Sequence, residues 1–135
     1  MIRSNTKGIY KEDNDSLSIE NNEAIRNIVD EIRERIKTKT HGFARLYPTV
    51  VMEYFGGMKK HFQNIKDILE PNALCAYIVG DQSSYLQVNI PTAEILSSIV
   101  SELGYEVLEI IPWRTSWATV TSKKIGMVHF FRQIG

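Results

Sequence analysis

The stretch that decides the fold is an almost wholly apolar run that ends in a glycine and an aspartate: Ala73-Leu74-Cys75-Ala76-Tyr77-Ile78-Val79-Gly80-Asp81. Its length and the turn residues before it favour a β-strand over residues 73–79 rather than a helix. Because the run is continuous rather than alternating, we expect both faces of the strand to be covered, as in a parallel sheet. Cys75 has no histidine partner at a recognisable spacing, so we interpret it as an inert core thiol rather than a nucleophile.

Helix and strand patterns alternate downstream of this run. A helix opens at Pro91 and ends at Gly104, where glycine suits the left-handed conformation of a C-terminal cap. Two strands follow over residues 105–111 and 126–134, joined by a loop over residues 112–124. A strand-helix-strand unit is a right-handed crossover with parallel strands, whereas the last strand is expected to return antiparallel. The sequence therefore predicts an α/β fold with a three-stranded mixed sheet.

Two helices are predicted upstream, over residues 21–37 and 48–69, because apolar side chains recur there at three- and four-residue steps. The pair Gly56-Gly57 interrupts the second helix at a cost of about 1 kcal/mol per glycine relative to alanine. It marks a kink or a place where another backbone comes close. Residues 1–18 are mostly polar and are expected to form a flexible arm, which leaves residues 19–135 as a single domain.

Composition excludes several classes of protein. The 16 basic and 16 acidic side chains cancel, so no global field attracts nucleic acid or an anionic membrane. One cysteine in 135 residues excludes a disulfide scaffold and favours a cytoplasmic location, and no apolar run approaches the ~20 residues that span a bilayer. The three histidines are too scattered to suggest a zinc site. We interpret the acidic residues, Glu53 among them, as charges on solvated faces.

Two groups of residues are candidates for binding. Asp81, Ser83 and Ser84 follow the first strand, at the end where open α/β sheets bind ligands, and are candidates for substrate binding. The alternative for Asp81 is a structural role in bonding the amides of a turn. The predicted loop over residues 112–124 mixes indole rings with cations, which suit stacking on bases and contact with phosphates. The DNA-binding candidates are therefore Trp113, Arg114, Trp117, Lys123 and Lys124, although both tryptophans can equally serve as packing residues.

Three short motifs occur in a fixed order: Tyr54-Phe55-Gly56-Gly57-Met58-Lys59, then Val79-Gly80-Asp81, then Ile90-Pro91-Thr92. In this order the segment from about residue 45 to residue 131 resembles the C-terminal half of S-adenosylmethionine-dependent DNA methyltransferases. Those enzymes modify the exocyclic amine of adenine or cytosine and include the methylases of restriction-modification systems. The resemblance implies part of a Rossmann-like methyltransferase sheet whose last strand lies between the other two. It also implies S-adenosylmethionine as the cofactor of the family.

Two motifs of that family are absent from the sequence. No glycine-rich cofactor loop occurs, and none of the four prolines lies in the Pro-Pro-aromatic motif that holds a flipped base. We therefore assign no catalytic residue and expect this chain alone neither to bind S-adenosylmethionine nor to transfer a methyl group.

The sequence thus suggests a fragment or subunit of a DNA modification methyltransferase, either one piece of a split enzyme or a truncated gene product. An incomplete sheet would leave an apolar edge and face open. We therefore expect a homo-oligomer or a partner chain that carries the other half of the fold, with DNA as a further possible partner. The alternative is a small non-catalytic binding or assembly module built on the same fold.

Overall fold

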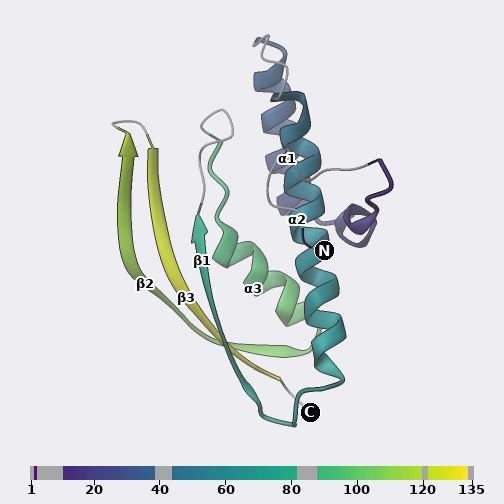
Figure 1. Cartoon of the computed structure of the whole chain (residues 1–135), viewed down its shortest axis with the longest axis vertical. Coiled ribbons are helices and arrows are strands. Elements are labelled where there is room, and N and C mark those ends of the chain that lie inside the picture. Colours follow the sequence, from purple (N-terminus) through teal and green to yellow (C-terminus); the bar gives the residue numbers. More distant parts are fainter. Residues whose placement is uncertain (1, 3–10, 39–43, 82–87, 120–121, 134–135) are drawn as a thin grey trace. The chain divides into compact units, whose positions relative to one another are not determined.

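The computed structural model describes residues 2, 11–38, 44–81, 88–119 and 122–133, and for Asp81 and residues 112–133 it describes the backbone only (Figure 1). The chain divides into two compact units, residues 1–61 and 62–135, and the boundary lies inside helix α2 (Tyr47–Lys66). Among the described residues, no helix is long and apolar enough to cross a membrane.

Helices make up the described part of residues 1–61. A 3-10 helix, η2 (Asp15–Ile19), precedes α1 (Glu23–Ile36), and a 3-10 turn, η3 (Ala44–Leu46), leads into α2. The apolar stripe predicted for the first helix is confirmed, because the buried residues of α1 are Ile25, Ile28, Val29 and Ile32. The Asn22 side chain caps this helix by accepting a hydrogen bond from the Ile25 amide at 3.1 Å.

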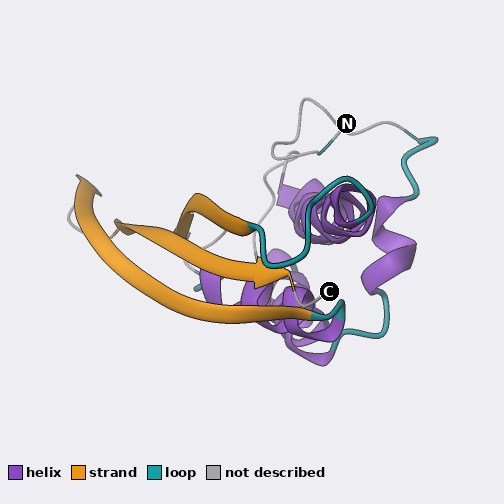
Figure 2. Cartoon of the chain, turned by 90° about the horizontal axis from the view of Figure 1, so that it is seen from below, coloured by secondary structure: helices purple, strands orange, loops and turns teal. Residues whose placement is uncertain are grey.

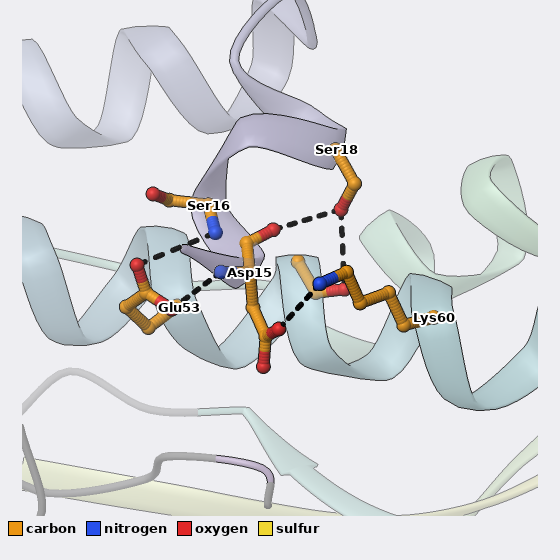
Figure 3. A network of polar contacts seen from close by, with 6 residues as sticks. Asp15, Ser16, Ser18, Glu53 and Lys60 are labelled. Atoms are coloured by element: carbon orange, nitrogen blue, oxygen red, sulfur yellow. Dashed lines mark hydrogen bonds and ion pairs between the residues drawn. The ribbon is translucent and has the colours of Figure 1, made fainter. Parts of the chain in front are cut away.

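The flexible arm expected over residues 1–18 is corrected for the residues of η2. The backbone amides of Asp15 and Ser16 donate to the Glu53 carboxylate of α2, at 3.0 and 3.3 Å (Figure 3). The composition of residues 1–18 does not predict this contact, because a short polar segment gains order only from a partner that supplies hydrogen bonds.

The glycine pair of α2 explains how η2 comes so close. A side chain at Gly56 would clash with the Asp15 carbonyl group, whereas one at Gly57 would meet Ile2 and the Asp15 carboxylate at 3.3 Å. Helix α2 continues through both glycines. Of the two interpretations of this pair, a kink or the close approach of another backbone, the close approach is therefore confirmed at Gly56.

Residues 62–135 contain the strands, which are long and curved (Figure 2). Strand β1 (Leu74–Asp81) is followed by helix α3 (Thr92–Glu102) and by strands β2 (Tyr105–Thr119) and β3 (Ser122–Gln133). The chain is thus of mixed helix and strand composition, as predicted. The strand order is β1-β3-β2, and β3 runs antiparallel to both of its neighbours.

Two details of the predicted sheet are wrong. Strands β1 and β2 run in the same direction, but β3 separates them, so the sheet is antiparallel rather than mixed. The loop expected over residues 112–124 is largely strand, because β2 continues to Thr119 and β3 begins at Ser122. The backbone groups of β2 and β3 hydrogen-bond to each other in this region. This pairing keeps the segment extended although its sequence has no alternating apolar pattern.

One face of the sheet packs against helices. Ile95, Leu96, Ile99 and Val100 of α3 are buried, and α3 contacts both β1 and β2. The Phe62 ring, at the end of α2, lies edge-on to Tyr77 of β1 with ring centroids 5.3 Å apart. The Tyr105 hydroxyl donates to the Phe62 carbonyl at 2.6 Å. Gly104 ends the crossover helix with a φ of 91°, as the sequence predicted.

The other face of β1 is open, which corrects the expectation that both faces of this strand are covered. Exposure alternates along the strand, and Leu74 and Ile78 expose 72% and 71% of their surface. Leu108 and Ile111 of β2 are also exposed, at 42% and 37%. No described residue covers the side of β1 that carries Leu74 and Ile78, and an apolar run alone does not specify how many packing partners it finds.

Candidate functional site

One substrate-binding candidate, Asp81, lies at the same end of the sheet as the DNA-binding candidates. Asp81, the last residue of β1, pairs with Ile125 of β3, and Ile125 pairs with Thr115 of β2. Neighbouring strands lie ~4.8 Å apart, so the backbones at Asp81 and Thr115 are about 10 Å apart. The sequence placed Asp81 at the end of the first strand and the DNA-binding candidates on a later loop, and the register of β3 shows that they share one end of the sheet.

A two-stranded extension continues beyond the end of β1. In this segment Ser116 pairs with Lys124, and Trp117 pairs with Lys123. Arg114 pairs with Gly126, which itself pairs with Gly80 of β1. Four of the five DNA-binding candidates therefore occupy regular positions on a hairpin rather than positions in a loop. A paired backbone holds such residues at fixed spacing, which a loop does not.

Trp113 lies at an irregularity of β2. The register with β3 moves from Pro112 directly to Arg114, so Trp113 is the additional residue of a β-bulge. Proline has no amide to donate to a ladder and occurs in sheets on edge strands such as β2 or at bulges. Two other register shifts fall between Val107 and Glu109 and between Trp117 and Thr119. Bulges increase the local twist of a strand, in keeping with the curvature of the sheet (Figure 2).

Of the substrate-binding candidates, Ser83 and Ser84 lie outside the described residues, and Asp81 is described by its backbone alone. Asp81 is the last paired residue of the strand rather than the first residue of a loop. Both alternatives for its carboxylate, ligand binding and bonding of turn amides, therefore stay open.

Cys75 and two tyrosines form the titratable part of the covered face. Burial raises the pKa of the Cys75 thiol above its ordinary value. Burial first, and then the charges of Cys75 and Tyr105, raise the pKa of Tyr77. The pKa of Tyr105 is raised mainly by burial and further by Cys75 and Asp67. A thiol with a raised pKa is protonated at neutral pH and is a poor nucleophile, but Cys75 is partly exposed rather than the core residue that we expected.

Sequence reasoning missed Glu53. This carboxylate is only 2% exposed and accepts the two amides of η2, so it is not the solvated charge that we expected. Its position three residues before Gly56 places both on one face of α2. An acidic residue one turn from a glycine pair was the available signal. Among the described residues, no group of three or more histidine, cysteine or acidic side chains is placed to hold a metal ion.

Comparisons with protein-family models, with curated proteins and with solved structures found no match to this chain.

Proposed function

We propose that this chain is one part of a DNA methyltransferase-like protein for exocyclic amines, inactive by itself, and that a second polypeptide completes its sheet. The observation that carries the proposal is the open face of β1. Leu74 and Ile78 expose 72% and 71% of their surface on a strand that contains no charged residue before Asp81. Natural sheets protect such faces and edges with charges, bulges or covering elements, and β1 has none of these among the described residues.

The strand order supports the proposal. The resemblance implies a last strand that lies between the other two, and the order here is β1-β3-β2 with β3 antiparallel to both. In this order β1 has no neighbouring strand on its second side among the described residues, and an edge strand of this kind can pair with a strand from another chain. A partner that supplies the neighbouring strand would cover both the edge and the open face.

S-adenosylmethionine enters the proposal as the cofactor of the complete protein. The sequence contains neither a glycine-rich loop nor the Pro-Pro-aromatic motif, so the second polypeptide would contribute both. A different chain would supply these motifs together with a strand and a cover for β1, whereas a second copy of this chain would supply only the strand and the cover.

Association is the first test. The variant Ile78→Lys places a charge on the open face, and we expect it to weaken association at least tenfold in sedimentation experiments at high micromolar concentration. Ile68→Lys is the matched control, because Ile68 is even more exposed, at 80%, but follows α2 rather than lying in the sheet. A wild-type chain that stays monomeric at that concentration, and that acquires no partner from its own cell extract, contradicts the proposal.

Activity is the second test. Purified chain is expected to transfer no labelled methyl group to duplex DNA, and calorimetry is expected to detect no binding of S-adenosylmethionine. Transfer by the chain alone would overturn the proposal. Activity that appears only after addition of the associated polypeptide would support a split enzyme, whereas association without activity would favour the non-catalytic assembly module.

The β2-β3 hairpin is the part that we propose for DNA contact. Support comes from the register, which holds Arg114, Lys123 and Lys124 on paired strands at the same end of the sheet as Asp81. Arg114→Ala combined with Lys123→Ala is expected to weaken binding to duplex DNA and to reduce its salt dependence by about two phosphate contacts. Arg33→Ala combined with Lys37→Ala, in the exposed ion pairs of α1, is the matched control. Equal effects of the two double variants would exclude the hairpin.

A further inference from the structure

The Glu53 carboxylate of α2 is buried but is stabilised by residues from outside its own helix. It is 2% exposed and accepts the amides of Asp15 and Ser16, the first two residues of η2. Asn14, at the N-cap position of η2, makes no side-chain cap bond. Glu53 therefore takes the place of a capping residue for η2, and η2 in turn supplies the hydrogen bonds that a buried carboxylate requires.

Two lysines hold η2 at its two ends, and Figure 3 shows one of them, Lys60. The Lys60 ammonium group pairs with the Asp15 carboxylate at 2.9 Å, and Lys59 donates to the Ser18 carbonyl, also at 2.9 Å. The Ser18 hydroxyl has one proton, which lies between two acceptors: the Asp15 carbonyl of η2 at 2.8 Å and the Gly56 carbonyl of α2 at 3.2 Å. Apart from the bond within η2, each of these contacts joins η2 to α2.

The docked position depends on the glycine at position 56. A Cβ atom there would clash with the Asp15 carbonyl group, whereas a Cβ atom at Gly57 would lie at 3.3 Å from its nearest neighbours. Glu53, Gly56 and Lys60 recur at steps of three and four residues, and so they share one face of the helix. On this face Glu53 and Lys60 make polar contacts with η2 at the two ends. Gly56 lies between them and leaves room for the Asp15 carbonyl group.

Helix α2 and η2 differ in how far the structure of each depends on the contact between them. Helix α2 has 20 residues and its own ladder of backbone hydrogen bonds. By contrast, η2 is one turn of five residues whose single buried side chain is Ile19. Segments with few buried apolar contacts open at a lower free energy than the elements on which they dock.

We infer that residues Asp15–Ile19 form a strap that opens and closes on α2 as a unit while α2 stays helical. When the strap opens, water reaches Glu53, and the face of α2 that carries Gly56 becomes accessible. The strap is thus a conformational device that controls access to this face, independent of the function proposed for the sheet.

Amide hydrogen exchange of the full chain tests the strap. In the wild type, the amides of Asp15 and Ser16 are expected to be protected, to share one opening rate, and to exchange at least tenfold faster than the amides in the middle of α2. Protection equal to that of α2 would overturn the inference, because the strap would then open only with the helix. Absence of any protection would overturn it too, because η2 would not be docked.

Gly56→Ala and Gly57→Ala form the matched pair of variants. Alanine is the better helix former at both positions, so each variant is expected to keep or increase the protection of α2. Only Gly56→Ala is expected to reduce the exchange protection of the Asp15 and Ser16 amides, by at least tenfold. Unchanged protection of these amides in Gly56→Ala contradicts the strap. Glu53→Gln removes the carboxylate charge without adding a clash, and a several-fold loss of protection is expected in it as a second, independent measure.

Discussion

The two faces of the sheet carry similar apolar side chains in opposite surroundings. On the covered face, Tyr77 lies against Phe62, and Leu96 of α3 is completely buried. On the open face, Leu74 and Ile78 expose 72% and 71% of their surface. The same strand residues 74–79 contribute to both faces, so apolar composition alone does not determine burial. What determines it is whether another element packs on that side.

The comparison predicts a large difference between two truncations. Leu96→Ala removes a fully buried side chain and is expected to lower the free energy of unfolding by about 2–5 kcal/mol. Ile78→Ala removes a side chain that is 71% exposed and is expected to change it by no more than about 0.5 kcal/mol. Urea unfolding of dilute protein measures both. Similar losses in the two variants would mean that the open face is covered in solution.

A smaller effect is expected from the polar contact beneath the covered face. Tyr105 is 2% exposed and its hydroxyl donates to the Phe62 carbonyl at 2.6 Å. Tyr105→Phe keeps the ring and loses the hydrogen bond, so we expect a loss of about 1 kcal/mol in the free energy of unfolding. The same denaturation experiment checks this value. A variant as stable as the wild type would show that the Phe62 carbonyl finds another donor.

The smallest expected effect is a dependence of stability on alkaline pH, which arises from three groups on the covered face. The pKa values of Cys75, Tyr77 and Tyr105 are all raised above their ordinary values of 9.0 for cysteine and 10.0 for tyrosine. The unfolded chain therefore loses these protons at lower pH than the folded chain, and stability is expected to fall as the pH rises above about 9. Cys75→Ala is expected to delay the onset of this fall. Stability that stays constant between pH 8 and pH 11 would contradict the direction of all three shifts.

Much of the local structure follows from patterns in the sequence. The apolar stripe over residues 21–37 corresponds to α1, and Gly104 ends the crossover helix with the expected positive φ. These features depend on residues close together in the chain, whose spacing encodes helical period and whose glycine encodes a left-handed turn. The resemblance also implied that the last strand lies between the other two.

The sequence by itself thus determined the three α-helical segments to within a few residues, the end of the crossover helix at Gly104, and that an apolar strand follows residue 72. Tertiary structure alone decided that Glu53 is buried by the amides of η2, that β1 keeps one open face, and that Asp81 shares an end of the sheet with the β2-β3 hairpin. The physical reason is that burial and register depend on partners distant in the chain. The residues next to a position in the sequence do not specify which distant residues will pack against it or pair with it.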